Sequence, residues 1–118
     1  MEKLIPNFCR IVRAKIYFTR TRKIIPLQDI IMLQGEVNYT LLHLLGGRKV
    51  LIPRTLKLFE SVLENYDFLR THRAFIINCE HLKSIDEEGL SMRMTNNLLA
   101  TVSRRRKIRV NERLQIEH

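Results

Sequence analysis

The stretch LSMRMTNNLLATVS, from Leu90 to Ser103, decides the fold class of this chain. Apolar residues alternate with polar ones from Leu90 to Thr95, and they do so again from Leu98 to Ser103. A period of two is typical of a strand with one buried face. Asn96-Asn97 lies between the two runs, and asparagine tolerates the left-handed backbone of a tight turn. The stretch therefore predicts an antiparallel β-hairpin.

Short runs rich in β-branched and aromatic residues continue outward from this hairpin. Gly46-Gly47 is a turn signal, because adjacent glycines supply the positive φ that a tight hairpin requires. About eight short strands joined by hairpins predict a single, mainly antiparallel β domain. The expected strands outside the hairpin are Ile11–Thr19, Asp29–Leu33, Tyr39–Leu45, Lys49–Ile52, Ala74–Ile77 and Leu82–Ile85.

One interior segment has a helical period instead. Between Arg54 and Asn65, apolar residues recur on one face at Leu56, Phe59, Val62 and Leu63, so we expect one short interior helix there. The basic segment Arg104–Arg113 leaves open a short helix or a packed tail.

Composition limits the functional classes. The chain has 118 residues, enough for one core, and its 21 Lys and Arg against 12 Asp and Glu give a net charge of +9. That excess favours a polyanionic partner, because bound phosphates release counterions. Two distant cysteines are typical of a reducing compartment. Because no apolar run is long enough to span a membrane and no signal peptide precedes the domain, we expect a cytoplasmic protein without a membrane partner.

Catalytic and metal-binding patterns are weak. His72, Cys79 and His81 do not have the spacing of a common zinc site. The acidic segment Asp86–Glu88 beside Gly89 is typical of a hairpin tip. The sequence has no phosphate-binding glycine loop and no nucleophile elbow. We therefore expect no enzyme, no metal, no cofactor and no small-molecule substrate.

Basic residues gather beside the predicted breaks between strands. The groups are Arg20, Arg22 and Lys23, then Arg70, His72 and Arg73, then Arg104–Lys107. A loop arginine can pair with both O6 and N7 of guanine, whereas lysine and serine suit phosphate oxygens. The alternative is an Arg70 salt bridge and a solvated charged tail. The predicted helix carries Glu60 and Glu64, which phosphates would repel, so any reading of DNA must use loops and strand ends.

The segment FLRTHRAFIIN, from Phe68 to Asn78, resembles the LytTR family, the DNA-binding output domain of bacterial response regulators. Three further segments resemble the family in the same order: Leu27–Leu33 with Asn38-Tyr39, Thr55–Glu60, and Val102–Lys107. The chain departs from the family pattern at Ala74, where serine is usual, and at Gln34-Gly35, where Glu-Ala is common.

The resemblance implies an elongated antiparallel β-sheet over residues 23–114, preceded by a lead-in strand and turn (residues 1–22) and followed by a tail (residues 115–118). It implies sequence-specific binding of double-stranded DNA for transcriptional regulation, with loops inserted into successive major grooves. Repeated half-sites and a possible homodimer are expected, because one small interface binds weakly. A receiver domain is missing, so the chain is either free-standing or part of a larger regulator. An RNA-binding or ribosome-associated protein and a protein-interaction module remain the alternatives.

The same resemblance implies roles for individual residues. The base-reading residues are Asn38, Tyr39, Arg73 and Arg104. The phosphate or supporting residues are Arg70, His72, Ser103, Arg105, Arg106 and Lys107. From its own chemistry, Asn78 is instead expected to cap a turn toward Glu80-His81.

Overall fold

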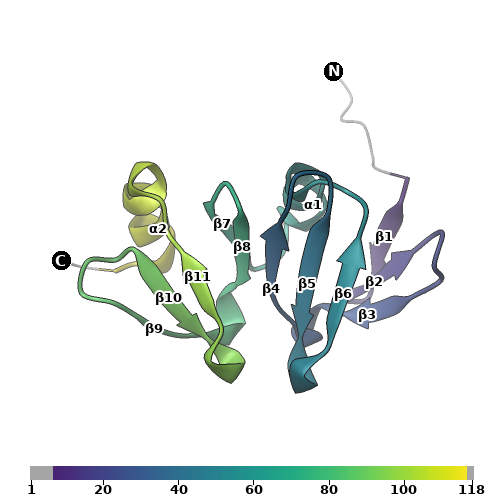
Figure 1. Cartoon of the computed structure of the whole chain (residues 1–118), viewed down its shortest axis with the longest axis horizontal. Helices are drawn as coiled ribbons and strands as arrows, with labels where there is room; N and C mark the ends of the chain where they lie inside the picture. Colours follow the sequence, from purple (N-terminus) through teal and green to yellow (C-terminus); the bar gives the residue numbers. More distant parts are fainter. Residues whose placement is uncertain (1–6, 117–118) are drawn as a thin grey trace.

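The computed structural model describes residues 7–116, and its strands form three antiparallel sheets (Figure 1). The central sheet has the order β6-β5-β4-β8-β7, and the others have the orders β1-β2-β3 and β11-β10-β9. The mainly β fold with antiparallel pairing is thus confirmed, although the strands are divided among three sheets. The bounds are β1 Cys9–Val12, β2 Lys15–Phe18, β3 Ile24–Pro26, β4 Ile30–Gly35, β5 Thr40–Leu44, β6 Lys49–Ile52, β7 Phe68–His72, β8 Phe75–Asn78, β9 Leu82–Ile85, β10 Ser91–Met94 and β11 Leu99–Thr101.

The central sheet is covered on both faces, so side chains that alternate along its strands enter two separate cores. Leu33 of β4 and Ile76 of β8 belong to the first core, together with the N-terminal sheet and α1. Met32 and Ile77, the neighbours of these residues on the same two strands, belong to the second core, together with the β11-β10-β9 sheet and α2. Strands β4 and β8 therefore form the rigid partition between the two halves of the molecule.

Helix α1 (Leu56–Leu63) lies within the predicted helical segment and buries Leu56, Phe59 and Leu63. The N-terminal strands pack on the same helix, because Phe8 and Phe18 meet the Phe59 ring edge-on at 5.3 and 6.3 Å between ring centroids. Residues 8–18 thus share a core with the rest of the domain. The division at residue 22 stays a prediction, and residues 1–6 and 117–118 lie outside the described part of the chain.

One expectation about local structure was wrong. The predicted strand Ile11–Thr19 is a hairpin, because Arg13 and Ala14 adopt positive φ of 51° and 60° and turn the chain between β1 and β2. Neither residue type signals such a turn. The basic segment after β11 is a 3-10 turn, Arg104–Arg106, followed by α2 (Lys107–Leu114), so of the two alternatives left open the helix is the one that the structure contains.

The hairpin predicted around Asn96-Asn97 is confirmed. Both asparagines adopt the left-handed conformation, with φ of 63° and 59°, and β10 pairs antiparallel with β11. Within residues 7–116, no helix is long and apolar enough to span a lipid bilayer, since α1 and α2 have eight residues each.

Candidate nucleic-acid interface

Three breaks between strands lie side by side on one edge of the molecule, the upper edge in Figure 1. They are the β4–β5 loop, the β7–β8 turn and the segment that follows β11. Backbone hydrogen bonds link them in that order: the Gly35 N–H donates to the Ala74 carbonyl at 2.8 Å, and the Ser103 N–H donates to the Thr71 carbonyl at 2.9 Å. The edge therefore brings together the three loops in which the sequence predicts base-reading residues.

The β4–β5 loop presents the predicted residues Asn38 and Tyr39 to solvent. The Glu36 N–H donates to the Tyr39 carbonyl at 2.8 Å, which closes the loop and leaves Val37 and Asn38 at its tip. Val37 is 90% exposed, more than any other large apolar residue in the described chain. The sequence prediction did not include Val37, although an apolar residue beside Asn38 in a polar break was the available signal.

Gly35 at the end of β4 positions this loop against α1. A Cβ atom at Gly35 would lie 3.1 Å from the Cβ of Leu56, which is tighter than most Cβ contacts and would require Leu56 to move slightly. The departure from the family pattern at Gln34-Gly35 therefore has a packing role, because it lets the start of α1 approach β4.

The β7–β8 turn carries Arg73 to solvent and is held from below by Arg70. The Arg70 guanidinium donates to the His72 carbonyl at 3.3 Å and to the Arg73 carbonyl at 2.5 Å. It also forms an ion pair with Glu60 of α1 at 3.0 Å. Only 15% of the Arg70 side chain is exposed. Arg70 thus forms the salt bridge that the sequence left open as the alternative to a DNA contact. Its hydrogen bonds also support the turn that presents Arg73.

His72 stabilises the same turn through its ring. Its Nδ1 atom accepts a hydrogen bond from the Ala74 N–H at 3.0 Å, so the neutral ring carries its proton on Nε2. Burial lowers the pKa of His72, and the nearby positive charges of Arg73, Arg106 and Arg70 lower it further. A neutral ring with a free Nε2–H is a hydrogen-bond donor at the edge of the site.

Ser103 begins the third segment as the cap of a helical turn. Its hydroxyl oxygen accepts a hydrogen bond from the Arg106 N–H at 3.2 Å, while Arg104 and Arg105 are exposed. Arg106 is half-buried and lies toward Arg70, and burial together with the Arg70 charge lowers its pKa. Lys107, also half-buried, starts α2. Two exposed arginines therefore stand at the end of β11.

Thr71 joins the second and third segments inside the molecule. It is fully buried, and its hydroxyl donates to the Thr101 carbonyl at 2.8 Å. Nothing in the sequence pattern predicts this contact, because the two residues are 30 positions apart.

Asn78 is a structural residue, as predicted. Its side-chain oxygen accepts a hydrogen bond from the Glu80 N–H at 3.1 Å and so caps the turn that follows β8. Its amide group also donates to the carbonyls of Leu27 and Ile30, which fixes the start of β4.

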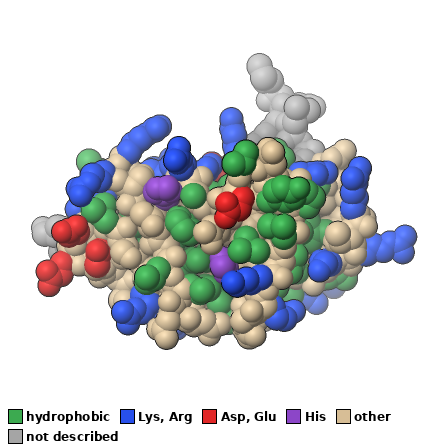
Figure 2. Space-filling view, viewed as in Figure 1, with side chains coloured by type: hydrophobic (Ala, Val, Ile, Leu, Met, Phe, Trp, Pro, Cys, Tyr) green, Lys and Arg blue, Asp and Glu red, His purple; other side chains and the backbone are tan. Residues whose placement is uncertain are grey.

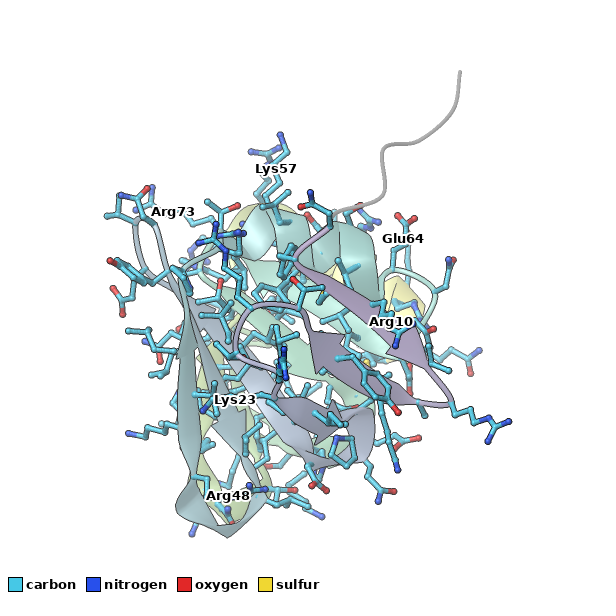
Figure 3. All side chains as sticks on the ribbon, turned by 90° about the vertical axis from the view of Figure 1, so that its right-hand side faces the viewer. Arg10, Lys23, Arg48, Lys57, Glu64 and Arg73 are labelled. Atoms are coloured by element: carbon cyan, nitrogen blue, oxygen red, sulfur yellow. The ribbon has the colours of Figure 1, made fainter. Side chains whose placement is uncertain are left out.

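Charge is unevenly distributed over the surface. Figure 2 shows Lys and Arg side chains along the upper edge, at the right-hand end and along the lower edge, whereas most of the visible acidic side chains gather at the β9–β10 end. Arg73 and Lys57 lie at the upper edge, whereas Arg48 lies at the opposite, lower end of the molecule (Figure 3). Asp86, at the acidic end, accepts hydrogen bonds from the N–H groups of Leu90 and Ser91, which lower its carboxyl pKa and close the hairpin.

Cys79 and His81, which belong to the weak metal pattern, have other roles in the fold. His81 uses both ring nitrogens, at 2.9 Å from the Thr95 hydroxyl and 2.6 Å from the Gln28 carbonyl. Burial, followed by the charge of Asp67, raises the pKa of Cys79 to about 11, which disfavours a thiolate ligand. Within the described residues, no group of three or more His, Cys, Asp or Glu side chains could hold a metal ion.

Comparisons with known proteins agree with the geometry. A family model described as the LytTr DNA-binding domain matches residues 20–115. A solved structure, the LytTr DNA-binding domain of a putative methyl-accepting/DNA response regulator from Bacillus cereus, is 21% identical with a TM-score of 0.71. The match covers 87% of this chain and 98% of that one, which shows a shared fold. A search of curated protein sequences gives no significant match.

Proposed function

Because the chain belongs to the LytTr DNA-binding domain family, we propose that its three linked loops read base pairs in successive major grooves of double-stranded DNA. Membership of this family implies DNA binding for transcriptional regulation, and the family is one of binding domains rather than enzymes. The proposal concerns which groups contact the DNA and how.

The observation that carries the proposal is the hydrogen-bonded row of loops. Gly35 is bonded to Ala74, and Thr71 is bonded to Ser103, so the loops have fixed relative positions. Each loop presents at least one predicted base-reading residue to solvent: Asn38 and Tyr39 on the first, Arg73 on the second and Arg104 on the third. Fixed spacing between exposed polar groups suits a duplex, because the base edges repeat at regular intervals along the groove.

The chemistry of these side chains defines what each can recognise. The Asn38 amide can donate to N7 and accept from N6 of adenine, with Tyr39 beside it on the same loop. Arg73 and Arg104 can each make two parallel hydrogen bonds to O6 and N7 of guanine. We therefore expect the half-site to contain adenine and guanine at positions whose separation is fixed by the sheet.

The surrounding basic groups would hold the phosphate backbone. Arg105 and Lys107 supply positive charge beside Arg104, and Ser103 and Arg106 flank them. His72 would donate its Nε2–H to a phosphate oxygen, because its Nδ1 atom is already an acceptor. Arg70 acts as support, since its donors already hold the β7–β8 turn. These contacts orient the domain without conveying sequence.

Affinity from one such edge is expected to be modest. Repeated half-sites, bound by two copies of the chain, would raise it by linking the binding events. A homodimer on DNA and a cytoplasmic location belong to the same proposal.

Selection of bound duplexes from a random pool tests the proposal and returns the half-site spacing. Arg73→Ala and Arg104→Ala should each weaken binding to the selected duplex by roughly 5- to 150-fold, the loss of one bidentate base contact. Binding to random duplex should change little. Arg93→Ala, an exposed arginine on β10 away from the edge, is the matched control. If both loop variants bind the selected duplex as tightly as the control does, the assigned reading residues are wrong.

Two further measurements address the alternatives. Competition with single-stranded RNA should be weaker than competition with duplex DNA, and the reverse order would favour an RNA-binding protein. Affinity should fall steeply between ~50 and ~200 mM salt, because phosphate contacts release counterions. A salt-insensitive complex would instead favour a protein-interaction module.

A further inference from the structure

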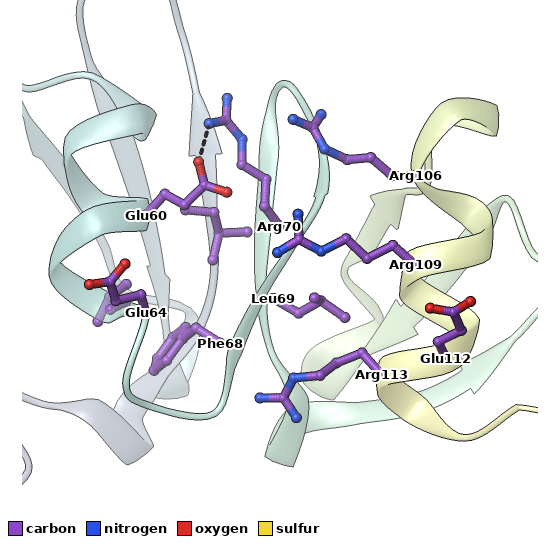
Figure 4. Close-up of a pocket in the computed structure, with 11 residues that line it drawn as sticks. Glu60, Glu64, Phe68, Leu69, Arg70, Arg106, Arg109, Glu112 and Arg113 are labelled. Carbon is purple, nitrogen blue, oxygen red and sulfur yellow. Dashed lines mark hydrogen bonds and ion pairs between the residues drawn. The ribbon is translucent and has the colours of Figure 1, made fainter.

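A cavity of about 420 Å³ lies beside β7, between α1 and α2 (Figure 4). Its size is within the range of small-molecule sites, roughly 300–1,000 Å³. It is separate from the exposed tips of the three loops, because none of Asn38, Arg73 and Arg104 lines it. The function proposed above uses two of its lining residues, Arg70 as support of the β7–β8 turn and Arg106 beside the phosphate backbone, but gives the space itself no role.

One wall of the cavity is lined by three arginines, one at the end of the 3-10 turn and two on α2. Arg106, Arg109 and Arg113 are separated by three and four residues and so share one helical face. Figure 4 shows all three side chains projecting into the space between the helices. Arg113 is paired with Asp67 at 3.6 Å. Among the described residues, the guanidinium groups of Arg106 and Arg109 make no hydrogen bond or ion pair.

Positive charge is concentrated at the upper end of the cavity. Arg70 and Arg106 lie there, and the proximity of Arg70 helps to lower the Arg106 pKa. Glu60, the acidic residue at this end, is already paired with Arg70 at 3.0 Å. Glu64 and Glu112 lie lower in Figure 4. Glu60 offsets part of the repulsion between these arginines, and an anion bound at the upper end would offset more of it.

The rest of the lining is apolar. Phe68 and Leu69 of β7 contribute side chains, together with Leu63 of α1 and Ile76 of β8. An apolar surface next to unpaired guanidinium groups suits a ligand with an oxyanion at one end and a hydrophobic ring at the other.

We propose that this cavity binds a small organic anion. Its carboxylate or phosphate group lies between Arg106 and Arg109, and its apolar body packs against Phe68 and Leu69. Arg70 connects the cavity to the reading edge, because the same guanidinium also holds the carbonyls of His72 and Arg73. Occupancy would therefore perturb the β7–β8 turn, and any consequence for DNA binding rests on the function proposed above.

NMR titration of the full chain, labelled with 15N and free of DNA, tests the site directly. The probes are phenyl phosphate, benzoate, inorganic phosphate and phenol. We expect the better of phenyl phosphate and benzoate to shift the amides of Leu69, Arg106 and Arg109, and to bind about tenfold more tightly than inorganic phosphate or phenol. Preference for phenyl phosphate would identify a phosphate ligand, and preference for benzoate a carboxylate ligand.

Arg109→Gln should weaken binding of the preferred probe about tenfold, because it removes a charge-assisted hydrogen bond. Arg109 is exposed and unpaired among the described residues, so the variant should fold normally. Arg93→Gln, outside the cavity, should bind as the wild type does. The proposal is overturned if neither aromatic anion binds, if inorganic phosphate binds equally well, or if Arg109→Gln has no effect. Since no DNA is present, these outcomes do not depend on whether the loops read bases.

Discussion

Arg70→Lys separates the two roles available to this arginine, support of the β7–β8 turn and direct contact with phosphate. Lysine keeps the positive charge but loses the planar fork of donors. The wild-type guanidinium makes three contacts at once, to Glu60 at 3.0 Å, to the His72 carbonyl at 3.3 Å and to the Arg73 carbonyl at 2.5 Å. A lysine ammonium on its single stem can replace about one of these contacts.

The expected loss of stability follows from the two contacts that lysine cannot make. Each net hydrogen bond contributes about 1 kcal/mol, and the contact to Glu60 contributes less because 44% of the Glu60 side chain is exposed. We therefore expect Arg70→Lys to lower the free energy of unfolding by about 1–2 kcal/mol. The melting temperature should fall by about 5–10 °C. Urea denaturation and thermal melting measure the two quantities.

The same variant should affect recognition more than general affinity for DNA. Displacement of the Arg73 backbone should reduce the ratio of specific to random binding by roughly tenfold, the loss of most of one bidentate contact. The slope of log affinity against log salt should stay unchanged, because the net charge is unchanged. Fluorescence anisotropy with the selected duplex and a random duplex, at several salt concentrations, measures both.

Arg48→Lys is the matched control, because Arg48 forms an exposed ion pair with Asp29 at 3.7 Å at the opposite end of the molecule. It should cost no more than about 0.5 kcal/mol. If Arg70→Lys behaves like this control in both stability and binding ratio, Arg70 does not hold the turn. If Arg70→Gln lowers the salt slope by about one while Arg70→Lys does not, Arg70 contacts phosphate instead.

Further predictions concern single residues elsewhere in the structure. Val37→Ala should weaken operator binding by up to about 15-fold, because the substitution removes two apolar carbons and about 0.8 kcal/mol is lost per apolar carbon removed from contact. If Val37 contacts a thymine methyl, replacing that thymine with uracil should abolish the difference between the two proteins in fluorescence anisotropy, and an equal loss on both duplexes would argue against the contact. Asn78→Ala should lower the free energy of unfolding by about 2–3 kcal/mol in urea, because the carbonyls of Leu27 and Ile30 lose their donor, whereas a loss below about 0.5 kcal/mol would contradict that role. His72 has a pKa below 6.5 in the folded chain, so the unfolded chain takes up its proton first as the pH falls, and the stability contributed by the neutral ring is present above about pH 6.5 and is lost below it. Urea unfolding at pH 7.5 and 5.5 should therefore show a larger loss for the wild type than for His72→Gln, and equal losses would refute the assignment. Cys9 is buried with a thiol pKa raised to about 11, so iodoacetamide should modify it at pH 8 only after unfolding, as read by mass spectrometry; rapid modification of the folded protein would contradict this.

The parts of the fold that could be predicted are those encoded over a few adjacent residues. The alternation from Leu90 to Ser103 and the Asn96-Asn97 turn are local signals, and the structure contains the corresponding hairpin. The turn at Arg13-Ala14 is different, because neither residue favours positive φ and the β-branched and aromatic residues on both sides favour a single strand. Tertiary packing of Ile16 and Phe18 in the first core sets the register there.

The candidate site was predictable as a set of loops but not as a connected edge. Basic residues beside strand breaks, together with the family resemblance, indicated Arg73 and Arg104. The hydrogen bond from the Ser103 N–H to the Thr71 carbonyl joins segments 32 residues apart, and no local pattern encodes such a contact. The pairing of Arg70 with Glu60 could not be predicted from the sequence either, because it depends on where α1 lies relative to β7.

The partition formed by β4 and β8 has a consequence for how such a protein can change its target. Val37, Asn38, Arg73 and Arg104 are all exposed, and none contributes to either core. If these residues read bases as proposed, substitutions at the loop tips can change which bases are recognised at little cost in folding free energy. The distance between the loop tips is instead set by the packed strands that carry them, and changing it would require a different packing of the core. New base preferences should therefore arise readily by substitution at the loop tips. New spacings between recognised bases should instead arise from a different arrangement of domain copies on the DNA.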